Sequence, residues 1–142
     1  MREILFRGKR IDNGEWIYGY YARKGADKES FRHYICVSTF SSDYQSNYTY
    51  PFYLYDYEVD PSTVGQYTGL TDKNGKKIFE GDIILRRYVR PYFLVEYSEE
   101  ETEYQANFFD GSYASLYKYF SSKESKVIGN IHDNPELLED KS

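Results

Sequence analysis

Several groups of residues have types and spacing that could bind a metal ion, catalyse a reaction or bind a partner. A possible zinc-binding pair is considered first. His33 and Cys36 are the only histidine and cysteine that lie close together in the sequence, and both residue types bind zinc. The segment around them is predicted to be a strand, in which residues three apart point to opposite faces. A shared metal would need a bulge, so we expect no zinc site. His132 has no nucleophile in a partnering motif, and we expect it at the surface.

Carboxylates form the second group. Asp56, Glu58 and Asp60 alternate along a predicted strand, so their oxygens could bind a divalent cation from one face. Alternating like charges are more typical of a solvated strand face. The Asp72–Lys76 turn resembles the start of a calcium loop, but lysine and isoleucine occupy the later ligand positions, and turn chemistry explains the segment. We predict no metal site and no cofactor.

Glu80 and Asp82 flank a glycine and could in principle act as an acid–base pair. A structural interpretation is better, because glycine permits a kink and the Asp82 side chain can accept hydrogen bonds from local backbone as the next strand begins. The chain contains no phosphate-binding glycine loop, serine elbow or paired-cysteine motif. We therefore predict that the protein is not an enzyme. An enzyme or a small-ligand protein is still considered as a hypothesis, ranked after the two given below. Its site would have to be assembled from residues distant in the sequence.

A possible binding face follows this segment. The stretch Ile83 to Val89 is predicted to be a strand, and Arg86, Tyr88 and Arg90 would share one of its faces. Interleaved basic and aromatic residues on a barrel strand are typical of single-stranded nucleic-acid binders. The alternatives are a solvated face, or a patch that meets the acidic Glu99–Glu103 segment of a neighbouring subunit. Because the net charge is −5, nucleic acid is the less favoured partner.

The elements that position these residues are predicted from composition and alternation. The 18 tyrosines and 9 phenylalanines favour half-buried sheet surfaces, and tyrosine is common at interfaces. Many short strands with turns between them predict a mainly β fold, as a small barrel or sandwich with a short C-terminal helix. Strands are expected at 3–10, 16–22, 31–40, 52–59, 77–80, 83–89, 93–97, 104–109 and 126–131, and the helix at 136–140. Residues 111–120 are ambiguous.

Turn chemistry explains the segment from Gln66 to Ile84. Glycine and asparagine supply the backbone angles that tight turns require. We assign structural roles in turns and kinks to five of its residues: Gly69, Asn74, Gly75, Gly81 and Asp82. The polar stretch 41–50 is a possible arm or insertion.

The length of the chain, its single cysteine and its first residues indicate the number of domains and the expected cellular compartment. A chain of 142 residues fits one domain spanning 1–142. The single cysteine, Cys36, cannot form an internal disulfide, which suits a reducing compartment. The first ten residues lack a signal-peptide apolar region, and no run approaches the roughly 20 apolar residues of a membrane helix. We expect a cytoplasmic protein with no membrane partner.

Three sequence blocks resemble a known family. They read MREILFRGKR at the start, VDPSTVGQYTGLTDKNGKKIFEGDII in the middle and VIGNIHDNPELL near the end. The chain is similar in these blocks to the YopX-like family of small phage and prophage proteins. The resemblance implies a mainly β fold of barrel-like units in a large homo-oligomer, and it implies no established activity. The stretches 20–55 and 90–125 do not contribute to it.

Uneven charge supports the leading functional hypothesis. Residues 76–90 carry five basic side chains and two acidic ones, whereas residues 96–110 carry six acidic side chains and no basic one. Opposed patches can steer self-association as well as binding of a foreign partner. We therefore predict a non-enzymatic homo-oligomer that acts as a protein-interaction module for a host or phage protein. A single-stranded nucleic-acid binder is the alternative.

Overall fold

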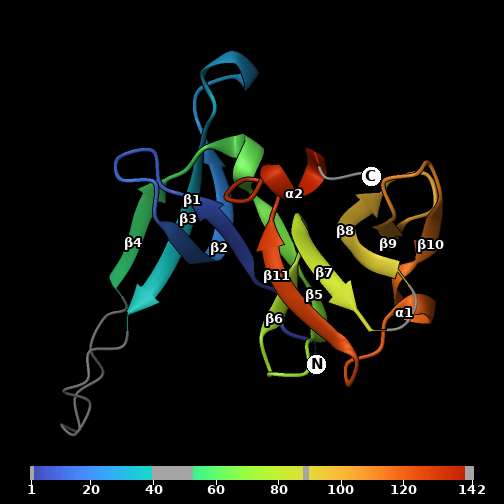
Figure 1. Cartoon of the computed structure of the whole chain (residues 1–142). Helices are drawn as coiled ribbons and strands as arrows, with labels where there is room; N and C mark the ends of the chain where they lie inside the picture. Colours follow the sequence, from blue (N-terminus) through green and yellow to red (C-terminus); the bar gives the residue numbers. More distant parts are fainter. Residues whose placement is uncertain (1, 40–52, 88–89, 140–142) are drawn as a thin grey trace, which may run out of the picture. The chain divides into compact units, whose positions relative to one another are not determined.

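The computed structural model describes residues 2–39, 53–87 and 90–139, and these form two compact units. The N-terminal unit is Ile4–Val64, and the C-terminal unit is Gly65–Ser142 together with Met1–Glu3. Both units are built mainly from antiparallel strands (Figure 1). The predicted mainly β fold is confirmed. The possible arm at 41–50 lies outside the described residues.

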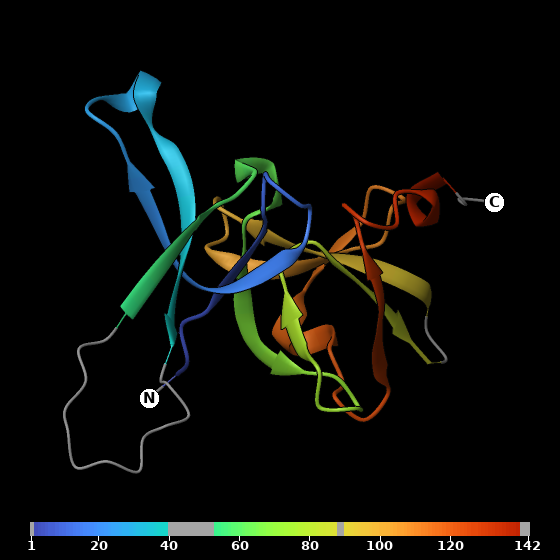
Figure 2. The same cartoon turned by 90° about the vertical axis from the view of Figure 1, so that its left-hand side faces the viewer.

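The N-terminal unit is a four-stranded antiparallel meander in the order β4-β3-β2-β1. Its strands are β1 (Phe6–Lys9), β2 (Trp16–Lys24), β3 (Arg32–Thr39) and β4 (Tyr53–Glu58), with short 3₁₀ turns η1 (Lys28–Ser30) and η2 (Pro61–Thr63). Figure 2 shows β2 and β3 as a long twisted ribbon that ends at η1. A turn at Asn13-Gly14 joins β1 to β2, and Gly14 has a φ of 72°, an angle that glycine adopts without steric cost.

Close backbone packing defines the middle of this meander. A β-carbon at Gly19 would lie 2.2 Å from the carbonyl oxygen of Cys36 on the next strand. Gly8 on β1 lies against Val59, which is fully buried, as is Ile35 on β3. Small residues on two strands therefore let the larger side chains of their neighbours fill the core of the unit.

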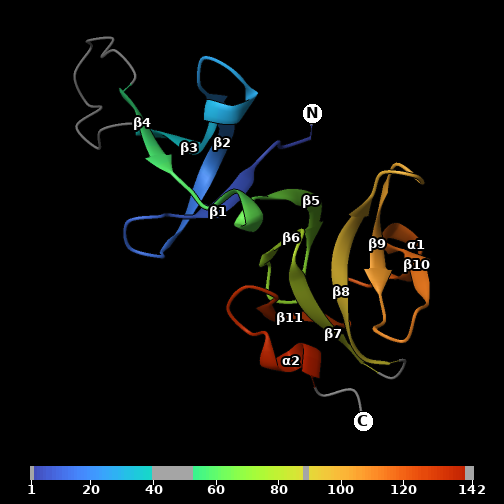
Figure 3. The same cartoon turned by 90° about the horizontal axis from the view of Figure 1, so that it is seen from above.

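The C-terminal unit combines a hairpin with a five-stranded sheet in the order β10-β9-β8-β7-β11 (Figure 3). The hairpin strands are β5 (Gly65–Thr71) and β6 (Lys77–Phe79). The sheet strands are β7 (Asp82–Arg86), β8 (Arg90–Ser98), β9 (Glu103–Asn107), β10 (Tyr113–Ser115) and β11 (Ser125–Asn130), with helices α1 (Leu116–Tyr119) and α2 (Glu136–Glu139). The sheet is open, because β10 and β11 are edge strands. The ambiguous segment 111–120 is thus a short strand followed by one helical turn.

An apolar cluster fills the C-terminal unit. Its buried members come from β6, β7, β8, β9, α1 and β11, namely Ile78, Ile84, Phe93, Val95, Ala106, Leu116 and Val127. The ring of Phe93 packs edge-on against Phe108 and Tyr119, with centroids 5.9 and 5.4 Å apart. Burial of these rings, together with the aliphatic side chains of the cluster, contributes to the hydrophobic stabilisation of the unit. The cluster holds the long strand β8 against its neighbours.

Two segments differ from the sequence-based expectations. No strand is predicted at 65–71, and Gly69 is expected in a turn, whereas the structure places Gly69 inside β5. Its φ of 90° coincides with a register shift against β6, so the glycine permits an irregularity within a strand rather than a reversal. The strand expected at 83–89 ends at Arg86.

The other turn residues take the expected kinds of geometry. Gly75 and Gly81 have φ angles of 79° and 91°. The buried carboxylate of Asp82 accepts a 2.8 Å hydrogen bond from the Phe79 backbone amide, and so it closes the kink between β6 and β7. At the hairpin tip, the backbone amide of Asn74 donates to Asp72 over 2.8 Å.

Candidate interaction surfaces

The predicted binding face does not lie on one strand. Arg86 ends β7 and Arg90 begins β8, where the two residues are paired across the sheet. Tyr88 and the side chain of Arg90 lie outside the described part of the chain. The stretch therefore spans the end of one strand and the start of the next, and alternation across a single strand does not place these three residues on one face.

Arg86 is held inside its own unit. Its guanidinium carbon lies 4.5 Å from the centroid of the Tyr119 ring, and its Nη1 donates to the Tyr119 carbonyl. Its Nε lies 3.7 Å from a carboxylate oxygen of Glu124, and the side chain is only 20% exposed. Arg86 thus contributes to packing rather than to an open binding face.

The other candidate chemical groups have local partners. His33 Nδ1 lies 2.5 Å from the hydroxyl of Tyr21, whose ring stacks on the imidazole. Lys24 pairs with Asp56, and Arg32 lies 3.6 Å from Glu58. Within the described ranges, no group of three or more histidine, cysteine or acidic residues is arranged to hold a metal ion.

Glu80 also has a structural role. Its Oε1 accepts a 3.0 Å hydrogen bond from the Gln66 backbone amide, and so it links the start of β5 to the end of β6. The carboxyl groups on either side of Gly81 therefore both accept hydrogen bonds from backbone amides.

The first surface hollow is the glutamate–tyrosine groove, defined by Glu96, Glu100, Glu101, Tyr97, Gln105 and Tyr113. It has a volume of about 440 Å³ and is lined from β8, the β8–β9 turn, β9 and β10. Tyr97 and Tyr113 are 44% and 54% exposed. None of its lining residues is basic. The groove therefore offers carboxylates and aromatic faces with no positive charge of its own.

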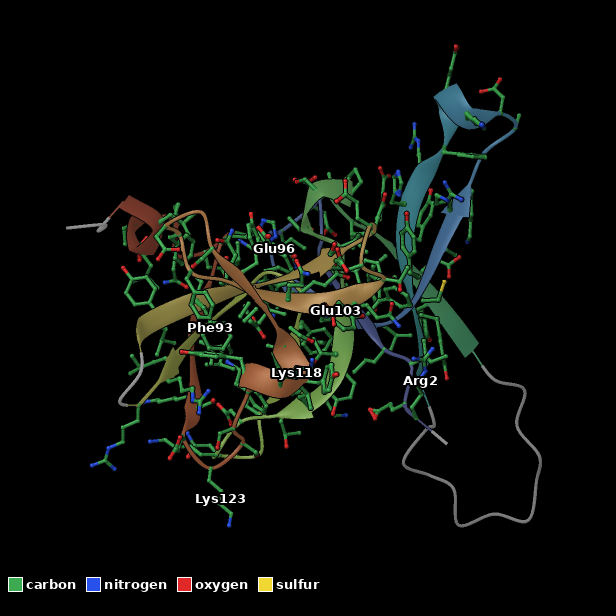
Figure 4. All side chains as sticks on the ribbon, turned by 90° about the vertical axis from the view of Figure 1, so that its right-hand side faces the viewer. Arg2, Phe93, Glu96, Glu103, Lys118 and Lys123 are labelled. Carbon is green, nitrogen blue, oxygen red and sulfur yellow. The ribbon has the colours of Figure 1, made fainter. Side chains whose placement is uncertain are left out.

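The second hollow, the Arg2 groove, shares Tyr97 with the first. It has a volume of about 460 Å³, and its lining includes Arg2, Glu103, Tyr104, Leu116 and Tyr117. The rings of Tyr97 and Tyr104 meet edge to face, 5.2 Å apart between centroids. Glu103 is oriented by the hydroxyl of Ser115, which donates to its Oε2 over 2.6 Å. Both Arg2 and Glu103 belong to the C-terminal unit, and both are labelled in Figure 4.

Tyr104, which lines the Arg2 groove, has a hydroxyl whose pKa is shifted from its ordinary value. Burial raises the pKa of its hydroxyl above the ordinary value. The Glu80 carboxylate and Tyr97 raise that pKa further, whereas the Arg2 guanidinium lowers it. A neutral hydroxyl at physiological pH can donate a hydrogen bond to a ligand. The lining of the groove contains no histidine or cysteine.

Charge is segregated along the five-stranded sheet. We define the acidic end as Glu96, Glu99, Glu100, Glu101 and Glu103, and the basic edge as Lys73, Lys76, Arg87, Lys123 and Lys126. Backbone hydrogen bonds join the parts of the basic edge, from Lys73 to Ser125 and from Arg87 to Glu124, and all five of its side chains are exposed. Figure 4 shows Lys123 at the lower left, away from Glu96 and Glu103. In the part of the chain that the structure describes, no carboxylate of the acidic end forms an ion pair.

Strand β8 runs along the sheet toward the acidic end. It starts at Arg90, paired with Arg86, and ends at Ser98, paired with Glu103. Nine residues at about 3.4 Å per residue span roughly 27 Å. This exceeds the Debye length of about 8 Å at physiological ionic strength. Charges at opposite ends of this strand are therefore largely screened from each other.

Sequence reasoning found the acidic run but not the grooves. The run 96–103 is visible as charge, yet Tyr113 and Arg2 reach the grooves through strand pairing and through the placement of the N-terminal residues. Pairing of Tyr113 with Asn107 on β9 carries its ring to the glutamates. No local pattern around Tyr113 predicts this partner, because cross-strand neighbours are set by register.

The fold and the surfaces define a mainly β protein with two surface grooves and separated charge. Among its described residues, no helix is long and apolar enough to cross a membrane. The profile of the family described as YopX protein matches residues 5–139. The chain belongs to the YopX protein family.

Two further comparisons complete this assignment. The crystal structure of protein EF1440 from Enterococcus faecalis is similar over 97% of this chain and 99% of that chain, with a TM-score of 0.54 and 23% sequence identity. At that identity the likeness shows the fold alone. No curated protein sequence matches this chain.

Proposed function

We propose that this protein is a non-enzymatic interaction module of phage or prophage origin that forms a homo-oligomer in the bacterial cytoplasm. Its partners would be other copies of itself and a host or phage protein. The charge separation in the C-terminal unit carries the proposal. The acidic end lies around the Ser98 end of β8, and the basic edge lies beside β11, so each region can attract the opposite region of another copy. The phage origin rests on the family resemblance.

The placement of the polar groups supports a role without catalysis. Catalysis by a nucleophile or general base needs a group whose hydrogen bonds are directed at a reacting atom. Instead, Glu80 and Asp82 bind backbone amides, and His33 is stacked on Tyr21. The glutamates of the acidic end lie instead beside exposed tyrosines, a combination suited to binding a protein surface.

Light scattering tests the oligomer directly. We expect the mass at low salt to exceed that of one chain and to fall at high salt, because surface charges are screened. The double substitution Lys123→Glu with Lys126→Glu should weaken the assembly. Lys28→Glu with Arg32→Glu, in the N-terminal unit, makes the same change in net charge and should leave it intact. A strict monomer at every salt and protein concentration would contradict the proposal.

Single-stranded nucleic acid is the second candidate, favoured by the basic edge alone. Its five exposed cations could neutralise successive phosphates. Arg86, the residue from which this hypothesis began, is held by Tyr119. A titration with a labelled oligonucleotide at 20 mM and 200 mM salt decides the matter, since binding by phosphate neutralisation should be strongest at low salt. Absence of binding at low salt excludes this candidate.

A further inference from the structure

The chain contains its own example of how it binds an arginine. The guanidinium of Arg10 lies 4.5 Å from the centroid of the Tyr57 ring. It also donates two hydrogen bonds to the carboxylate of Asp12, over 2.9 and 2.6 Å. A planar cation can satisfy an aromatic face and a carboxylate together, because its N–H groups lie in the plane that stacks on the ring.

This packing recurs within the chain. Three more arginines place their guanidinium carbons 4.5 to 5.4 Å from an aromatic ring centroid, in the pairs Arg7–Trp16, Arg23–Phe31 and Arg86–Tyr119. Both compact units use the arrangement. Stacking of a guanidinium on an aromatic ring is thus a recurring contact in this protein.

The glutamate–tyrosine groove presents the same groups without the cation. Tyr97 and Tyr113 are about half exposed, and Glu96, Glu100 and Glu101 line the same hollow of about 440 Å³. Among the described residues, no lysine or arginine lies over either of these two rings. The groove therefore has the components of the Arg10 site, and room for a side chain from outside.

The spacing of the carboxylates favours an organic cation over a metal ion. In the described ranges no three acidic groups are arranged to hold one metal ion, and Glu96, Glu100 and Glu101 line the hollow. A guanidinium is broad enough to contact separated carboxylates through different N–H groups. A lysine ammonium is a compact charge that is more strongly hydrated and cannot stack as a plane.

We propose that the glutamate–tyrosine groove binds an arginine side chain from a segment of another protein. The proposal rests on the proposed function, for which it names the chemistry of the foreign partner. A second copy is the weaker source of an arginine, because four of the five cations on the basic edge are lysines and Arg87 is its single arginine. The foreign segment should carry arginine in an exposed, extended stretch that can reach into an open groove.

Calorimetric titration with three short peptides tests the proposal. The probes are an amidated Gly-Arg-Gly-Arg-Gly peptide and its lysine and citrulline counterparts, at 25 mM salt. We expect the arginine peptide to bind about three- to tenfold more tightly than the lysine peptide, because stacking and paired hydrogen bonds both favour it. The uncharged citrulline peptide should show no measurable binding.

Groove variants locate the binding. Glu100→Gln with Glu101→Gln should weaken arginine-peptide binding about tenfold or more. The matched control, Glu15→Gln with Glu29→Gln, makes the same change in charge on exposed residues of the N-terminal unit and should change binding less than twofold. Tyr113→Ala should weaken binding about threefold, whereas Tyr113→Phe, which keeps the ring, should bind normally. These positions are exposed, and circular dichroism verifies the fold of each variant.

Two outcomes overturn the inference. One is equal binding of the lysine and arginine peptides, or binding that the groove variants leave unchanged. The other is loss of self-association in Glu100→Gln with Glu101→Gln while no variant alters peptide binding, which would assign the groove to contacts between copies. If light scattering shows a monomer that still binds the arginine peptide in the groove, the homo-oligomer fails and the arginine site stands.

Discussion

Replacement of Asp72 by alanine should destabilise the C-terminal unit strongly. The Asp72 side chain is 3% exposed. Its Oδ1 accepts hydrogen bonds from the backbone amides of Asn74 and Lys76, over 2.8 and 2.9 Å. Its Oδ2 accepts a 3.0 Å hydrogen bond from the amide of Val127, far along the chain on β11. One carboxylate therefore closes the β5–β6 turn and fastens it to the edge of the five-stranded sheet.

The magnitude follows from these three hydrogen bonds. Each hydrogen bond to a charged group contributes about 1.5–3 kcal/mol, and water can reach the turn amides after truncation. We therefore expect Asp72→Ala to lower the free energy of unfolding by about 3–5 kcal/mol. Asp72→Asn keeps one acceptor oxygen but directs an amide donor at a backbone N–H, and should cost about 1–3 kcal/mol.

Two measurements check this prediction. Urea unfolding followed by circular dichroism gives the total loss, and hydrogen exchange at the Val127 amide reports the long-range bond by itself. Lys73→Ala, at the neighbouring exposed position, is the control and should change stability by less than about 0.5 kcal/mol. A loss below 1 kcal/mol for Asp72→Ala, with protection of Val127 unchanged, would refute the reasoning.

Three further predictions follow from the same structure. Burial would raise the pKa of Asp72, but backbone amide donors, led by that of Val127, lower the pKa below its ordinary value. The stability that this carboxylate contributes should be complete above about pH 5 and lost as the pH falls below about 4. Acid unfolding of the Asp72→Asn variant should lack that loss. Gly19→Ala places a methyl group 2.2 Å from a backbone oxygen of Cys36, so thermal unfolding should show a loss of about 2 kcal/mol or more for the N-terminal unit. Tyr104 should ionise at a higher pH than exposed tyrosines, because burial raises its pKa; ultraviolet titration of Tyr104→Phe against wild type should remove a late step, and loss of an early step would contradict the assignment.

Strand content could be predicted from this sequence because it depends on local alternation. Segments such as β2, β3 and β11 carry aromatic or β-branched residues between clear turn signals, so their positions lie within a few residues of those expected. The strand β5 escapes prediction because Gly69 and Thr68 have turn-like composition. In the folded hairpin the pairing of β5 with β6 is irregular, and the Thr68 hydroxyl donates to the Ile78 carbonyl over 2.8 Å. That contact is a property of the folded hairpin.

The candidate surfaces could be predicted only in part for a related reason. The acidic run and the basic stretch are visible as charge, but which basic residues remain at the surface depends on tertiary contacts. Arg86 and Arg87 are adjacent in sequence, yet Arg86 is packed on Tyr119, whereas Arg87 is exposed. The glutamate–tyrosine groove requires β10 beside β9, which the sequence around Tyr113 does not predict.

The fastening of the β5–β6 turn also bears on solubility. An open sheet presents unpaired backbone groups at its edges, and these can recruit strands from other molecules into fibrils. Here the β11 edge is capped from within, because the Val127 amide binds Asp72 and the Ser125 carbonyl accepts a hydrogen bond from Lys73. The other edge strand, β10, has only three residues and leads directly into α1. Strand addition at the two edges of this five-stranded sheet is therefore discouraged.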